Sequence, residues 1–188
     1  MRDYKIVFIH GYTASSKVNW YPEMVHLLSA KGIECVVPDL PGGKYPHIHE
    51  WLEGVHLAVG DTTKPLVLVG HSLGTRALLL YLEKFQPHVK AAFLVAAFNN
   101  DTANGLRYDG ESYPDFFAYK IDLRKVIPLV DTFVVIHSKD DSSIPYTQGV
   151  EMAEDLGAEL RTYEDRDHFS APENAAIIFS ELERVLDF

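Results

Sequence analysis

Cysteine is almost absent from the sequence: Cys35 is the only one among 188 residues, which excludes an internal disulfide. It lies in the short apolar run 35–37, where we expect a small buried side chain rather than a catalytic thiol. The core must therefore come from packing alone. A chain of this length buries roughly 70 % of its extended surface, which is enough for such a core. We expect one domain over residues 1–188.

Positive charge is also scarce. The chain has 17 Lys and Arg against 27 Asp and Glu, which gives a net charge of −10 with neutral histidines. Proteins that bind duplex nucleic acid normally present a basic surface to the phosphates. The charge balance therefore predicts no nucleic-acid partner.

Long apolar runs are missing as well. The longest strongly apolar stretch, residues 91–98, is far shorter than the ~20 residues that a membrane-spanning helix needs. A strand-like run already begins at residue 6, so the N-terminal residues hold neither the apolar segment nor the cleavage site of an export signal. We therefore expect a cytoplasmic protein without membrane insertion.

Short runs rich in β-branched residues alternate with longer helical patterns. The runs are residues 6–9, 34–37, 66–69, 92–96, 133–136 and 159–163. Five of the six lack polar alternation, which is typical of parallel strands covered on both faces. The pattern predicts an α/β protein, a three-layer sandwich with about six parallel strands.

Helix ends are marked by polar and glycine residues. Asn19 is expected to cap a helix that runs through residue 28 and stops at Gly32, and a second helix runs from about Thr147 to Gly157. The last helix follows residues 170–172 and repeats apolar side chains on one face. Each of these helices can cover the sheet.

The connection at residues 99–119 is long for a compact domain, and such loops often have a function. It contains five aromatic residues: Tyr108, Tyr113, Phe116, Phe117 and Tyr119. Because it leaves the carboxyl end of a strand, where ligands bind in open α/β sheets, these rings are expected to wall a substrate pocket. The alternative is that they cover the sheet as part of the core.

The pentapeptide Gly-His-Ser-Leu-Gly at residues 70–74 follows an apolar strand and precedes a helical run. Strand, tight turn and helix form the context in which G-x-S-x-G exposes a nucleophilic serine. Ser72 is therefore the candidate nucleophile. A serine hydroxyl is weak at neutral pH, so it requires a base and a group that orients the base.

Position along the chain selects these two groups. His168 follows the last strand and is the candidate base, whereas His137, at a strand end, is expected in a core or supporting role. Asp140 and Asp141 both follow the strand at 133–136. A buried aspartate that accepts the imidazole N–H fixes the tautomer of the base.

His49, Glu53 and His56 are spaced so that they could share one helix face and bind a metal. A metal needs three or four ligands in fixed geometry, and an ordinary amphipathic surface helix has the same pattern. We expect no metal and no cofactor.

Five stretches of the sequence fit one family pattern. They are residues 8–12 (Phe-Ile-His-Gly-Tyr), 37–42 (Val-Pro-Asp-Leu-Pro-Gly), 70–74, 141–145 (Asp-Ser-Ser-Ile-Pro) and 167–169 (Asp-His-Phe). Together they resemble the α/β-hydrolase superfamily. The short length and the Asn-Trp-Tyr-Pro stretch at 19–22 look like the small lidless serine hydrolases related to retinoblastoma-binding protein 9.

This resemblance implies a sheet of about six parallel strands, without the first two strands of larger hydrolases and without a large lid. The family pattern D-x-x-[hydrophobic]-P fits Asp141 better than Asp140 as the triad acid. A glycine near the histidine is common in the family, and this chain has Asp-Arg-Asp at 165–167 instead. The oxyanion hole is expected at the backbone amides of Tyr12 and Leu73.

The resulting hypothesis is a serine hydrolase that uses Ser72, His168 and Asp141 on a small carboxylic ester or thioester. Its pocket is expected to contain Tyr12, His71, Phe98, Phe116, Phe117, Ile144 and Phe169. The alternative is a protein-binding module that keeps the fold with residual or no activity. A protein partner does not follow from the residues.

Overall fold

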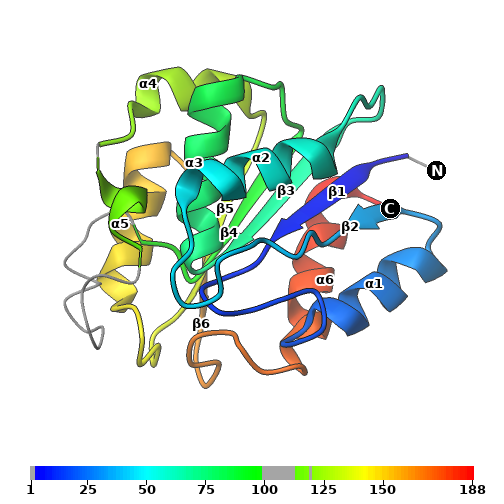
Figure 1. Cartoon of the computed structure of the whole chain (residues 1–188). Helices are drawn as coiled ribbons and strands as arrows, with labels where there is room; N and C mark the ends of the chain where they lie inside the picture. The colour runs from blue at the N-terminus through cyan, green and yellow to red at the C-terminus, as the bar shows by residue number, and fades with distance from the viewer. Residues whose placement is uncertain (1–2, 99–112, 119) are drawn as a thin grey trace.

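The computed structural model describes residues 3–98, 113–118 and 120–188 (Figure 1). Its sheet has six parallel strands in the order β2-β1-β3-β4-β5-β6. The strands are β1 (Lys5–Ile9), β2 (Glu34–Val36), β3 (Leu66–His71), β4 (Ala91–Val95), β5 (Phe133–Ser138) and β6 (Glu159–Tyr163). Each lies where the sequence predicts a strand, so the predicted parallel α/β sheet is confirmed.

Helices cover both faces of this sheet and make the outer two layers. One face carries α1 (Tyr21–Ala30) and α6 (Asn174–Leu186); the other carries α2 (Ile48–Val59), α3 (Leu73–Phe85) and α5 (Tyr146–Leu156) (Figure 1). In the described part of the chain between β4 and β5 lie the short elements η2 (Pro114–Phe117), α4 (Leu123–Val126) and η3 (Ile127–Leu129). The predicted three-layer arrangement is confirmed.

Successive side chains along the central strands enter opposite halves of the core. In β1, Ile6 and Phe8 pack toward α1 and α6, whereas Val7 and Ile9 pack toward α2 and α3. All four are fully buried. A strand buried on both faces needs apolar residues at every position, which is why these strands lack the polar alternation of a half-exposed sheet.

The chain reverses its direction of progress across the sheet between β1 and β3. β2 pairs with one edge of β1, and β3, β4, β5 and β6 then extend the sheet from the other edge. Ligands of open α/β sheets bind at the carboxyl ends of the strands beside such a reversal. The segment after β1 and the G-x-S-x-G turn after β3 meet at this point.

The structure corrects one helix boundary. α1 begins at Tyr21 with Trp20 at its N-cap position and no side-chain cap, while Asn19 has a left-handed backbone with φ of 56°. Pro22 in the first turn, with its fixed φ, suits a helix start. Asn19 therefore precedes the helix and does not cap it.

Part of the long connection lies outside the described residues, including Tyr108 and Tyr119. Within the described ranges, no inserted subdomain covers the sheet edge and no helix is long and apolar enough to cross a membrane.

Candidate active site

Ser72 occupies the tight turn between β3 and α3. Its φ of 53° is unusual for a residue with a side chain. The two motif glycines make the turn possible: a Cβ at Gly74 would lie 2.1 Å from the Ile9 carbonyl oxygen, and one at Gly70 would lie 2.7 Å from the Gly74 oxygen. The strand and helix therefore approach closely enough to lift the serine above the sheet edge.

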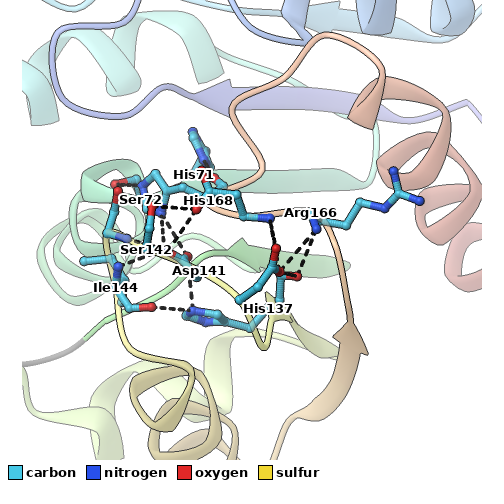
Figure 2. Close-up of polar contacts among 12 residues, drawn as sticks. His71, Ser72, His137, Asp141, Ser142, Ile144, Arg166 and His168 are labelled. Atoms are coloured by element: carbon cyan, nitrogen blue, oxygen red, sulfur yellow. Dashed lines mark hydrogen bonds and ion pairs between the residues drawn. The ribbon is translucent and has the colours of Figure 1, made fainter.

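The Ser72 hydroxyl begins a short hydrogen-bonded path (Figure 2). Its Oγ lies 2.9 Å from His168 Nε2. The other ring nitrogen, His168 Nδ1, lies 2.9 Å and 3.1 Å from the two carboxylate oxygens of Asp141. The structure thus brings together three residues that lie far apart in the sequence, after β3, β5 and β6.

Asp141 is a fully buried carboxylate side chain. Burial alone would raise its pKa, but hydrogen bonds from His137 and His168 outweigh this effect and hold the pKa of Asp141 well below its usual range. The backbone N–H groups of Ser143 and Ile144 add two more bonds to Oδ1, at 2.9 Å and 2.8 Å. The carboxylate is therefore ionised and fixed in place.

Asp140, the neighbouring carboxylate, contacts the backbone of the histidine loop, the segment 164–173 between β6 and α6 that carries His168. It accepts hydrogen bonds from Ser138 Oγ and from the amides of Arg166 and Asp167. The hydrogen bond from Ser138 lowers its pKa. The two adjacent carboxylates thus have separate contacts: Asp141 with the imidazole ring, and Asp140 with the loop that carries it.

The histidine loop has a constrained backbone, with positive φ at Asp165, Asp167 and Phe169. His71 Nε2 donates to the carbonyl oxygen of His168 at 2.8 Å. Burial lowers the pKa of His71 to about 3, so this ring is a neutral donor. Hydrogen bonds therefore connect the loop to the serine turn through His71 and to β5 through Ser138.

A second histidine, His10, organises the segment after β1. It donates from Nδ1 to the Gly11 carbonyl oxygen, and its Nε2 accepts the amide of Leu40, each at 2.9 Å. Burial lowers its pKa. The first bond orients the ring within the segment after β1, and the second links this segment to the one that follows β2.

The two segments expected to supply the oxyanion-hole amides lie beside the serine. Leu73 is the first residue of α3, where backbone N–H groups point out of the helix. Tyr12 follows Gly11, and a Cβ at Gly11 would lie 3.2 Å from Ser72 Cβ. The lack of a side chain at Gly11 brings this segment close to the serine.

A cavity of about 480 Å³ opens above Ser72 and His168. Gly11, Tyr12, Ala14 and His71 form part of its wall. The remaining lining residues all carry polar side chains: Thr13, Asn19, Lys44, Tyr45, Ser143 and Ser170. None of the described residues that line it is an aspartate or glutamate.

This lining differs from most of the predicted pocket. Tyr12 and His71 line the cavity, but five apolar residues do not: Phe98, Phe116, Phe117, Ile144 and Phe169. All except Phe117 are at most 1 % exposed and pack in the core. Phe117 is partly buried and packs against Phe98, with ring centroids 5.7 Å apart. Rings without polar atoms gain most by full burial, and here the core beneath the site offers it.

The α2 histidines contact neighbours on the surface. His49 lies 3.5 Å from Glu53, and the His56 ring stacks on Phe85 at 4.3 Å. Among the described residues, no group of three or more His, Cys, Asp or Glu side chains could hold a metal ion.

A sequence profile of the family described as serine hydrolase matches residues 6–183. The chain belongs to the serine hydrolase family. YdeN of Bacillus subtilis (strain 168) is 29 % identical over 167 residues, which cover 88 % of this chain and 85 % of YdeN. The serine hydrolase RBBP9 of Rattus norvegicus is 27 % identical over 155 residues, covering 82 % and 77 % of the two chains.

Solved structures of hydrolases share the architecture. The crystal structure of the B. subtilis ydeN product matches with a TM-score of 0.85 and 27 % identity, covering 98 % of this chain and 99 % of that one. Est1E from Butyrivibrio proteoclasticus matches with a TM-score of 0.76 at 17 % identity, over 98 % of this chain and 86 % of Est1E. At that identity, the second match shows the α/β-hydrolase fold alone.

Within this hydrolase, sequence reasoning missed the polar pocket wall. Lys44 and Tyr45 lie in a turn closed by a hydrogen bond from the Tyr45 amide to the Gly42 carbonyl oxygen. Gly42 has a φ of 100°, and the Tyr12 hydroxyl donates to the Lys44 carbonyl oxygen at 2.8 Å. The position of this turn could have indicated its role in the pocket, because it follows β2 beside the point where the chain reverses across the sheet.

Proposed function

We propose that this serine hydrolase cleaves small carboxylic esters or thioesters through an acyl-enzyme formed on Ser72. The observation that carries the proposal is the hydrogen-bonded path from Ser72 Oγ through His168 to Asp141. An imidazole between a serine and a buried carboxylate can take the serine proton during attack and return it to the leaving group.

The reaction proceeds in two balanced steps. Ser72 Oγ bonds to the acyl carbon while its proton passes to His168, and the leaving group departs with that proton. Water then attacks the acyl carbon while one of its protons passes to His168; the bond from that carbon to Ser72 Oγ breaks, His168 returns the proton to Ser72, and the carboxylic acid leaves. In both steps the carbonyl oxygen carries negative charge, and the backbone amides of Tyr12 and Leu73 stabilise it, because backbone donors held by the fold need no reorientation. Leu73 also begins α3, and the N-terminus of a helix favours negative charge.

The pocket supports a short, hydrophilic acyl group. Ligand sites are usually lined mostly by apolar and aromatic side chains, whereas this cavity has hydroxyl, amide and ammonium groups beside Ala14 and the rings of Tyr12, Tyr45 and His71. The phenylalanine rings that would suit a long acyl chain pack in or against the core and do not line the cavity. A long chain would leave apolar surface against polar groups, so its contribution to binding is small.

Hydrolysis of p-nitrophenyl acetate, butyrate and octanoate tests the proposal. We expect turnover that is fastest with the short esters and that falls by roughly 10³-fold or more in Ser72→Ala, measured against a folded control. Equal activity in Ser72→Ala, or no hydrolysis of any ester or matched thioester by the wild type, would overturn it. The second result would favour the protein-binding alternative.

A further inference from the structure

His137 is a fully buried histidine that the proposed reaction does not use. It lies in β5, and its Nε2 is 3.3 Å from Asp141 Oδ2 and 3.2 Å from the Ile144 carbonyl oxygen (Figure 2). Both neighbours are acceptors. Nε2 therefore carries a proton and donates it toward the same carboxylate that His168 contacts.

The opposite side of the ring is closed by α5. His137 Nδ1 is buried and has no hydrogen-bond partner among the described residues. A Cβ at Gly149 would lie 2.3 Å from this nitrogen, so the glycine is what lets the helix pack against the ring. A proton on Nδ1 would be buried without an acceptor, which is costly. The packing thus favours a ring proton on Nε2 over one on Nδ1.

The two oxygens of Asp141 are held by different donors. Oδ1 accepts the backbone amides of Ser143 and Ile144. Oδ2 is the oxygen nearer to His168 Nδ1, at 2.9 Å against 3.1 Å for Oδ1. Its other donor among the described residues is His137. Because the Asp141 side chain has no exposed surface, water is not at hand to replace that donor.

We propose that His137 is a positioning residue of the active site, whose Nε2–H fixes Asp141 Oδ2 and, through it, the ring of His168. This inference rests on the proposed function. Without the donor, Oδ2 is held by His168 alone, and only the two amides on Oδ1 still limit how far the carboxylate tilts about the bond to its Cβ. The imidazole then loses its alignment with Ser72, and a small misplacement of reacting groups is expensive in rate.

Two substitutions separate the donor from the bulk of the ring. His137→Leu removes the N–H, and we expect kcat for a short p-nitrophenyl ester to fall by about 10- to 100-fold with KM within about twofold. His137→Gln carries an amide N–H at a similar reach and should recover most of kcat. Wild-type kcat in His137→Leu, or equal losses in the two variants, would overturn the inference. If the leucine variant does not fold, His137→Asn, with its shorter amide, takes its place in the comparison.

A double-mutant cycle distinguishes positioning from a general loss of packing. In an Asp141→Ala background the target of the His137 donor is gone, so adding His137→Leu should lower kcat by less than about threefold. The same 10- to 100-fold loss in both backgrounds would show that the effect does not pass through Asp141.

Tyr146 provides a matched control, because its ring packs edge-on against His137 with centroids 5.9 Å apart. Tyr146→Leu removes this packing and leaves the donor, so kcat should stay within about threefold of wild type. A loss equal to that of His137→Leu would assign the effect to packing. Wild-type turnover is measured first: an inactive wild type overturns the proposed function as well, whereas an active wild type with an unaffected His137→Leu overturns this inference alone.

Discussion

Replacing Asp141 and Asp140 one at a time by asparagine tests the division of work between two adjacent carboxylates. Asp141 Oδ1 faces two backbone N–H groups and Oδ2 faces two imidazole N–H groups. An asparagine amide must turn its own NH2 toward one of these pairs, which sets donor against donor. The His168 ring can avoid the conflict only by moving its proton from Nδ1 to Nε2, the nitrogen that faces Ser72.

A ring protonated on Nε2 cannot accept the serine proton, so the variant loses its base. We therefore expect Asp141→Asn to lower kcat by roughly 10³- to 10⁴-fold, which corresponds to about 4 to 5.5 kcal/mol of activation free energy. Asp140→Asn keeps one oxygen that can accept the amides of Arg166 and Asp167, and we expect it to cost less than about tenfold because the imidazole keeps its partner.

The assay is steady-state hydrolysis of a short p-nitrophenyl ester, with thermal unfolding of each variant as the control for folding. The reverse ranking of the two variants would move the triad acid to Asp140. Losses below tenfold in both would contradict the proposed role of Asp141 altogether, because the geometry leaves His168 no other carboxylate partner among the described residues.

Three further predictions concern stability, the aromatic cluster and metals. Burial lowers the pKa of His71 to about 3, so between pH ~6 and ~4 only the unfolded chain binds this proton, and the free energy of unfolding should fall by up to about 1.4 kcal/mol per pH unit from this residue. When the free energy of unfolding is measured by urea denaturation at several pH values, its dependence on pH should be weaker in His71→Gln than in the wild type. An unchanged dependence would contradict the lowered pKa of His71. Phe116 is 1 % exposed, and its ring centroid lies 5.1 Å from that of Trp51. Phe116→Ala should therefore lower stability by about 3–5 kcal/mol and leave the acyl-length preference unchanged. An altered preference with little loss of stability would place Phe116 in the substrate pocket. EDTA should not change ester hydrolysis, and a loss that zinc restores would revive the site at His49, Glu53 and His56.

The parallel sheet could be predicted because burial on both faces leaves a direct mark on the sequence. The strand at 66–71 is apolar up to its motif glycine, and G-x-S-x-G needs a fixed local geometry. The strand and the serine turn could therefore both be predicted from the sequence. The partners of Ser72 followed from chain order in this fold. Their mutual distances, 2.9 Å on each side of the imidazole, are properties of the folded chain alone.

The pocket wall could not be predicted in the same way. Aromatic residues such as Phe116 fit a substrate pocket and a core equally well by composition, and only the packing around Trp51 decides between them. Lys44 and Tyr45 lie in a polar turn that resembles any surface loop in sequence. The role of Gly149 was also hidden, because its meaning comes from the His137 ring across the interface between α5 and β5.

The central claim is that Ser72 is the nucleophile of a working hydrolase. Treatment with a fluorophosphonate, followed by digestion and mass spectrometry of the peptides, tests this most directly. The account predicts one adduct per chain, located on Ser72, and none on a folded Ser72→Ala variant. An adduct on another residue, or equal labelling of the Ser72→Ala variant, would contradict it.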